Sequence, residues 1–82
     1  MKPVVYSVRA ARALRRHANR APALRAKMQQ YAENPLALAA NVKALQGVDA
    51  KRLRVGDFRI VFQEREDAIV VLDIGPRGSI YD

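Results

Sequence analysis

The stretch from Lys51 to Phe62, KRLRVGDFRIVF, concentrates basic side chains in one short segment. Arginine binds phosphate oxygens through a planar fork of donors and keeps its charge at neutral pH. Such side chains can hold a phosphodiester and stabilise the anionic phosphorane that forms when a ribose 2′-hydroxyl attacks the adjacent phosphorus. Phosphate binding is therefore the first chemistry that the sequence indicates.

Gly56 and Asp57 separate two runs of alternating side chains and are typical of a two-residue hairpin loop. Glycine at the first loop position favours a type II′ turn. In this register Arg54 lies directly opposite Arg59, and side chains alternate between the two faces of each strand. We expect one apolar face made of Leu53, Val55, Phe58, Ile60 and Phe62, and one basic face made of Arg52, Arg54 and Arg59.

The opposition of Arg54 and Arg59 needs an explanation, because like charges directly across a hairpin cost about a few tenths to 1 kcal/mol. One explanation is that both arginines splay into water, with Asp57 or Asp73 nearby, where surface charges also discourage edge-to-edge pairing. The other is that a polyanion normally occupies this face, since local rules tend to fail at functional sites. Spacing alone leaves both explanations open.

The rest of the chain predicts two helices that pack on the apolar face of this hairpin. Val4–Val8 is typical of a first strand, and residues 9–20 carry apolar side chains at helical spacing. A second helix follows and ends before Pro35, because the residue before a proline avoids helical backbone. Residues 36–47 fit either a short helix or an irregular connection, and residues 68–74 form an apolar last strand. The expected class is α+β, in the order β-α-α-β-β-β, with two helices packed on an antiparallel sheet.

The charge balance indicates an anionic partner. The 82 residues include 15 Lys and Arg against 8 Asp and Glu, which gives a net charge of +7 and a pI near 10.6. A folded and strongly basic domain favours nucleic acid or an acidic protein as its partner. A solvated surface kept soluble by its charge has the same composition and stays an alternative.

Several kinds of site are disfavoured by composition. The chain has no cysteine, so we expect no disulfide and no thiolate metal site, and its carboxylates lack metal-ligand spacing, so we expect no metal and no cofactor. His17 is the only histidine, which excludes a pair of histidines in acid–base catalysis, and its place on the inward side of the first helix indicates a structural role. The N-terminus lacks the pattern of a signal peptide, and no apolar stretch approaches the roughly 18 residues of a membrane span. We expect a soluble cytoplasmic protein with no membrane contact.

Residues 42–81 resemble the RelE/ParE superfamily of toxins from bacterial type II toxin–antitoxin systems. The resemblance lies in VKALQG, then KRLRVGDFRIVF, an acidic turn, IVVLDIG and PRGSIY, and the combination is more specific than any one motif. It implies a single toxin domain over residues 1–82 with a microbial-RNase-like fold. Toxins of the RelE branch cut messenger RNA in the ribosomal A site, so the resemblance implies a metal-independent endoribonuclease that inhibits translation.

The resemblance also implies which residues act. Tyr81 becomes the candidate for proton transfer, because neighbouring arginines would lower the pKa of its phenol; the alternative is a packing residue that caps the sheet edge. The expected partners are a cognate antitoxin, acidic or of mixed charge, together with the ribosome and mRNA. Arg9, Arg12, Arg16 and Arg20 are either a solvated face of the first helix or a contact for ribosomal RNA or an acidic antitoxin segment. By position in the motifs, the catalytic residues are Arg52, Arg59, Arg77 and Tyr81, and the RNA-binding residues are Lys43, Lys51 and Arg54.

Three positions depart from the superfamily pattern. Pro76 stands where His or Lys is common, Gly78 where a further basic residue is common, and Ala50 where some ribosome-dependent members have lysine. These departures keep two alternatives open. One is the ParE branch, which shares the fold and poisons DNA gyrase, and the other is a non-catalytic member that binds RNA or an antitoxin.

Overall fold

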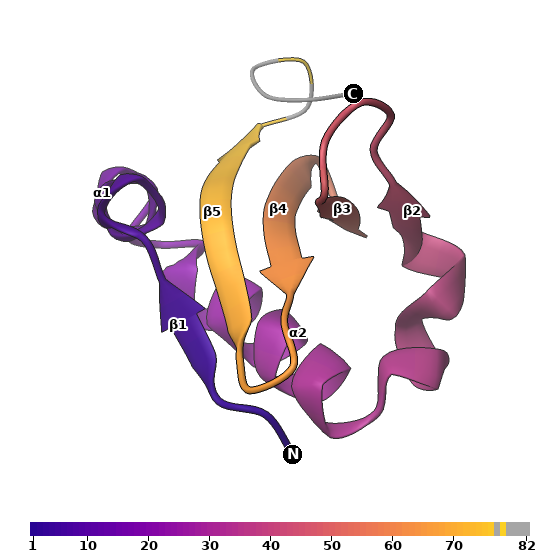
Figure 1. Cartoon of the computed structure of the whole chain (residues 1–82). Coiled ribbons are helices and arrows are strands. Elements are labelled where there is room, and N and C mark those ends of the chain that lie inside the picture. The colour runs from indigo at the N-terminus through magenta and orange to yellow at the C-terminus, as the bar shows by residue number, and fades with distance from the viewer. Residues whose placement is uncertain (77, 79–82) are drawn as a thin grey trace.

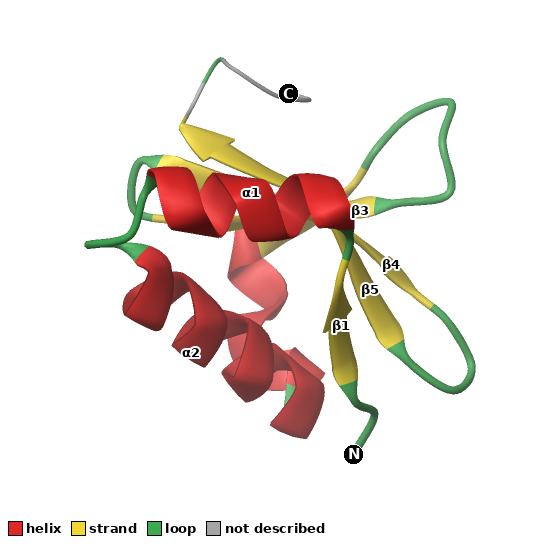
Figure 2. Cartoon of the chain, turned by 90° about the vertical axis from the view of Figure 1, so that its left-hand side faces the viewer, coloured by secondary structure: helices red, strands yellow, loops and turns green. Residues whose placement is uncertain are grey.

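The computed structural model describes residues 1–76 and Gly78, and the fold is a five-stranded sheet with helices packed against it. The sheet has the order β1-β5-β4-β3-β2 (Figure 1), with α2 behind the sheet and α1 beside its β1–β5 side. Figure 2, which views the left-hand side of Figure 1, brings α1 to the front, above α2. The elements are β1 (Val4–Tyr6), α1 (Val8–Arg16), α2 (Ala21–Glu33), the 3-10 helix η1 (Pro35–Asn41), β2 (Val42–Ala44), β3 (Lys51–Val55), β4 (Phe58–Glu64) and β5 (Ile69–Pro76).

Ser7 sets both the start and the position of α1. Its hydroxyl oxygen accepts a hydrogen bond from the backbone N–H of Ala10 at 3.0 Å, which satisfies one of the unpaired amides of the first turn. The same hydroxyl donates to the carbonyl of Leu72 at 2.8 Å. One side chain thus caps the helix and ties it to β5, the strand on which α1 chiefly packs.

The hydrophobic core lies between the helices and one face of the sheet. Each helix contributes an apolar stripe, with Ala10, Ala13 and Leu14 from α1 and Leu24 and Met28 from α2. The hairpin contributes the face predicted for it, because its alternate side chains point the same way. Four of the predicted residues, Leu53, Phe58, Ile60 and Phe62, are buried in this core, and Val55 packs against it half-buried.

The predicted hairpin register is confirmed. Val55 pairs with Phe58 and Arg54 with Arg59 across the turn. Gly56 has φ +59°, a backbone conformation that L side chains rarely adopt, whereas no described non-glycine residue has a positive φ. This combination fits the type II′ turn expected for Gly56 and Asp57.

The α+β class is confirmed, and the sheet has two features that the sequence did not reveal. Val42–Ala44, within the segment of undecided structure, forms the edge strand β2, while Pro35–Asn41 before it is the 3-10 helix. β1 joins the other edge parallel to β5, so the sheet is mostly rather than wholly antiparallel. Within the described ranges, 1–76 and 78, we find no helix that combines the length and apolarity of a bilayer span.

Candidate nucleic-acid interface

Basic side chains from three strands lie on the sheet face turned away from α2, which is the face toward the viewer in Figure 1. β2 supplies Lys43, which pairs directly with Arg52 of β3, so these side chains share this face. Lys43 and Arg54 are exposed and Arg52 is half-buried. Two cross-strand rows result: Lys43, Arg52, Val61 and Asp73 in one, and Arg54, Arg59 and Gly75 in the other.

Arg59 differs sharply from its cross-strand partner. It is only 7% exposed, whereas Arg54 is exposed. The explanation that both arginines splay into water is therefore wrong for Arg59, whose side chain is enclosed. An enclosed guanidinium keeps its charge and is held in a more defined place than a surface one.

Lys51 is not brought together with these arginines. It shares the core-side face with Leu53, two residues along the same strand, and its Nζ lies 3.1 Å from Oε1 of Glu64. Alternation along the strand already carried this signal, since the apolar face was defined through Leu53.

Glu64 is the centre of this second cluster. The Tyr31 hydroxyl donates to Oε1 of Glu64 at 2.6 Å. This hydrogen bond, together with Lys51 and Lys2, lowers the pKa of the Glu64 carboxyl, although its partial burial acts in the opposite direction. Burial, helped by Glu64, raises the pKa of the Tyr31 phenol, so this hydroxyl stays protonated and remains a donor.

The remaining predicted residues have different outcomes. Arg77 and Tyr81 lie outside the described residues, so their roles stay predictions. His17 packs edge-to-face on Phe58 with ring centroids 4.9 Å apart, which agrees with a structural role. In the part of the chain that the structure describes, no group of three or more His, Cys, Asp or Glu side chains could hold a metal ion.

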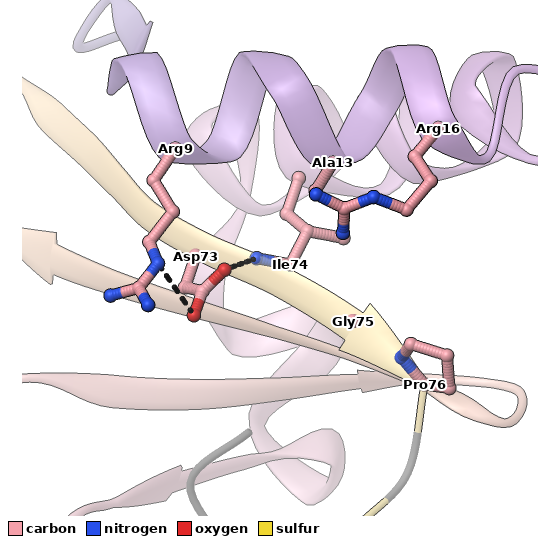
Figure 3. A pocket seen from close by; sticks show the side chains of 7 residues that line it. All are labelled: Arg9, Ala13, Arg16, Asp73, Ile74, Gly75 and Pro76. Carbon is pink, nitrogen blue, oxygen red and sulfur yellow. Dashed lines mark hydrogen bonds and ion pairs between the residues drawn. The ribbon is translucent and has the colours of Figure 1, made fainter. Parts of the chain in front are cut away.

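A pocket of about 230 Å³ opens between α1 and the end of β5 (Figure 3). Arg9 and Arg16 reach toward β5 from one side of α1, and Nε of Arg9 lies 3.7 Å from Oδ2 of Asp73. The sequence left Arg9 and Arg16 as either a solvated face or a contact for ribosomal RNA or an acidic antitoxin segment, and it did not place them beside β5. Their spacing of seven residues, two helical turns, is the signal that aligns them on one side of the helix.

The chemistry available on this face is anion binding. Lys43, Arg52 and Arg54 are cationic donors on two neighbouring strands, and the described part of the face offers one carboxylate, that of Asp73. Because Asp73 already lies against Arg9, the face remains cationic overall. Several basic side chains held on a rigid sheet suit the repeated phosphates of a nucleic-acid backbone better than a single small anion.

The fold is that of RelE-type toxins. The chain superposes on the crystal structure of YafQ from E. coli strain BL21(DE3) with a TM-score of 0.79 at 14% identity, covering 100% of both chains. The crystal structure of the intact E. coli RelBE toxin–antitoxin complex gives a TM-score of 0.73 at 21% identity, covering 93% of this chain and 96% of that chain. The archaeal RelE–RelB complex from Pyrococcus horikoshii OT3 gives 0.74 at 21% identity, covering 96% and 98%.

The family follows from the sequence match. The model of the family described as "ParE toxin of type II toxin-antitoxin system, parDE" matches residues 4–81. The chain therefore belongs to this family, within the RelE/ParE superfamily that its motifs indicated, and is a toxin of a type II toxin–antitoxin system. No curated protein matches the chain.

Proposed function

We propose that this toxin is a ribosome-dependent endoribonuclease that cuts mRNA and so inhibits translation, and that residues 1–82 act as one toxin domain. The observation that supports it best is the cationic sheet face, where Arg52 and Arg54 lie beside the enclosed Arg59. A phosphodiester backbone laid across this face meets donors from neighbouring strands. Their positions are set by backbone pairing, so little reorganisation is needed when charge develops.

The proposed reaction uses the RNA's own nucleophile. The 2′-hydroxyl attacks the adjacent phosphorus, the P–O5′ bond breaks, and a 2′,3′-cyclic phosphate and a 5′-hydroxyl result. Arg52 contacts the phosphorane and stabilises its extra negative charge, and the enclosed Arg59 adds its positive charge from within the sheet. We assign to Arg77 a contact with the scissile phosphate and to Tyr81 a proton transfer. Lys43 and Arg54 bind the flanking backbone, and the ribosome holds the mRNA in line for attack.

Lys51 is a weaker candidate for RNA binding than Lys43 and Arg54. Its ion pair with Glu64 on the core-side face means that RNA contact would require the lysine to leave that partner. We therefore place the RNA-binding role on Lys43 and Arg54 first.

We propose a cognate antitoxin of acidic or mixed charge as the protein partner. The RelBE and RelE–RelB structures of the same fold are toxin–antitoxin complexes. The net charge of +7 favours a partner whose toxin-binding segment carries acidic side chains.

Gyrase is the second candidate target, and a specific observation favours it. The matching family is described as ParE, and the chain has Pro76, Gly78 and Ala50 at positions where basic side chains occur in the superfamily pattern. In that case the cationic face would contact gyrase or its DNA without cutting RNA.

The two targets separate on the order of events after toxin induction. We expect incorporation of labelled amino acid to fall before that of labelled thymidine. Primer extension should then reveal cuts within the coding region of a reporter mRNA, and no cuts in a matched reporter whose start codon has been removed. An early fall in thymidine incorporation, with gyrase-linked DNA breaks and intact mRNA, would instead identify gyrase as the target.

Substitution of Arg52 ties this activity to the sheet face. We expect Arg52→Ala to slow mRNA cleavage by about 100-fold, the usual cost of removing one donor to a developing anion. Arg65→Ala, at an exposed position in the β4–β5 turn, is the matched control and should cut at the wild-type rate. Equal rates for the two variants would remove the sheet face from the proposal.

A further inference from the structure

The pocket between α1 and β5 has walls of unequal character. On one side α1 presents the side chains of Arg9 and Arg16, with the small side chain of Ala13 between them. On the other side lies the end of β5, where Gly75 has no side chain to fill the space. The pocket has a volume of about 230 Å³. Figure 3 shows the guanidinium groups of Arg9 and Arg16 on its α1 side.

Positive charge exceeds negative charge around this pocket, which favours the binding of an anion. Both oxygens of Asp73 are engaged, Oδ1 with the backbone N–H of Ile74 at 2.9 Å and Oδ2 facing Nε of Arg9 at 3.7 Å. Arg9 keeps its two terminal nitrogens as donors, because Asp73 faces only its Nε. Among residues 1–76 and 78, no carboxylate lies within ion-pair distance of Arg16.

The pocket is continuous with the basic face of the sheet. Asp73 pairs with Val61, which pairs in turn with Arg52, so the pocket lies at the end of the row that begins at Lys43. Gly75, in the pocket wall, is the cross-strand partner of Arg59. Since neighbouring strands lie about 4.8 Å apart, β5 and β3 are separated by about 10 Å, which a few nucleotides can span.

We infer that this pocket binds a phosphate group of the same RNA strand that crosses the sheet face. The pocket is thus a second phosphate subsite, separate from the one that holds the scissile bond. Arg16 is the direct ligand, and Arg9, oriented by Asp73, contributes its terminal nitrogens. The inference rests on the proposed function, because its ligand is the RNA of that reaction. Continuity with the basic row favours RNA over a carboxylate of a protein partner.

Arg15 provides a matched control for Arg16. Both are exposed arginines in the last turn of α1, so replacing either by alanine removes the same charge from the same helix. Only Arg16 lines the pocket. A difference between the two variants therefore reports on the pocket and not on the net charge.

The test measures binding of the full chain to a fluorescent 2′-O-methyl RNA dodecamer, which keeps the phosphates and lacks the attacking hydroxyl. Dissociation constants are followed by anisotropy over a series of salt concentrations. Loss of one phosphate contact on a single strand reduces the slope of log K against log salt by about 0.7. We expect that reduction for Arg16→Ala, the wild-type slope for Arg15→Ala, and most of the slope restored in Arg16→Lys, with equal melting temperatures for all variants.

Four results would overturn the inference. If the wild-type chain binds RNA and Arg16→Ala has the same slope, the pocket is no phosphate subsite, while the proposed function stands. Equal reductions of the salt slope for Arg15→Ala and Arg16→Ala would show that Arg16 acts only through the net charge of the helix. An unchanged RNA slope together with weaker binding of a hexaglutamate peptide by Arg16→Ala would assign the pocket to a protein carboxylate. Failure of the wild-type chain to bind the free RNA at all would also overturn the subsite, while the ribosome-dependent function would still be tested by the mRNA cleavage assay.

Discussion

At the scale of single residues, two arginines of identical chemistry differ because the sheet surrounds them differently. Arg54 and Arg59 face each other across the hairpin, yet Arg54 is exposed and Arg59 is 7% exposed. The aliphatic stem of an arginine contributes packing as well as charge when it is enclosed. The two positions should therefore respond differently to the same substitution.

Stability measurements can test this difference. We expect Arg59→Ala to lower the free energy of unfolding by about 1–3 kcal/mol, because it leaves an unfilled space beside β4. Arg54→Ala should change it by no more than about 0.5 kcal/mol, as is usual for an exposed side chain. Thermal melts of both variants give the comparison. Equal melting temperatures would contradict the burial of Arg59.

Glu64 predicts a pH dependence of stability. Its pKa in the folded chain lies below the ordinary value of 4.5, chiefly because of the hydrogen bond from Tyr31. The ionised Glu64 carboxylate therefore stabilises the folded chain. This contribution to the free energy of unfolding is complete above about pH 5.5 and is lost as the pH falls through the pKa of Glu64 in the folded chain. We expect the stability difference between wild type and Glu64→Gln to shrink between pH 6 and pH 3 in urea titrations.

Glu66→Gln is the control for this titration, since Glu66 is an exposed carboxylate in the neighbouring turn. Any change in its stability difference from wild type over the same range measures the effect of removing one surface charge. If the difference for Glu64→Gln changes no more than that for Glu66→Gln, the Glu64 carboxyl is not coupled to folding.

At the scale of elements, the position of α1 decides whether the pocket exists. The helix supplies Arg9 and Arg16, and it is held over β5 by the two hydrogen bonds of the Ser7 hydroxyl. The cap satisfies an amide of the helix, and the bond to Leu72 fixes the helix against the strand. One small side chain therefore governs both the stability and the placement of α1.

We expect Ser7→Ala to destabilise the fold by about 1–2 kcal/mol, because it removes a helix cap and leaves the Leu72 carbonyl without this donor. Ser7→Thr retains a hydroxyl and should keep most of that stability. Chemical denaturation compares the variants. An alanine variant as stable as wild type would show that neither hydrogen bond contributes to holding α1.

At the scale of the whole molecule, the chain combines a net charge of +7 with a cationic face built from three strands. The charge attracts a polyanion over a distance, and the sheet converts that attraction into a defined contact. The pair formed by Arg9 and Asp73 marks one border of this surface. The products of the proposed reaction should therefore be those of a site that stabilises charge with arginines.

We expect the cleaved RNA to end in a 2′,3′-cyclic phosphate, because the arginines stabilise an attack by the RNA's own 2′-hydroxyl. Cutting should persist in EDTA when intact ribosomes are maintained by polyamines. Treatment of the fragments with a phosphatase that opens and removes cyclic phosphate should make their 3′ ends ligatable. Ends that ligate without treatment, or cutting that stops on chelation alone, would contradict this mechanism.

The sequence by itself determined the features that depend on neighbours along the chain. The hairpin register followed from Gly56 and Asp57, because a two-residue loop leaves one way for the flanking residues to pair. The apolar face followed from alternation, and the same alternation also places Lys51 with the core-side residues. The motifs of residues 42–81 indicated the RelE/ParE superfamily, within which the chain belongs to the ParE toxin family.

Only the tertiary structure decided the features that depend on distant segments. β2 has three residues, too few for alternation to distinguish a strand from a loop, and it becomes a strand because β3 offers it an edge. β1 lies beside β5 although more than 60 residues separate their partners, a pairing that no local pattern encodes. The enclosure of Arg59 and the meeting of Arg16 with the end of β5 arise likewise from packing, because burial depends on what the rest of the fold places around a side chain.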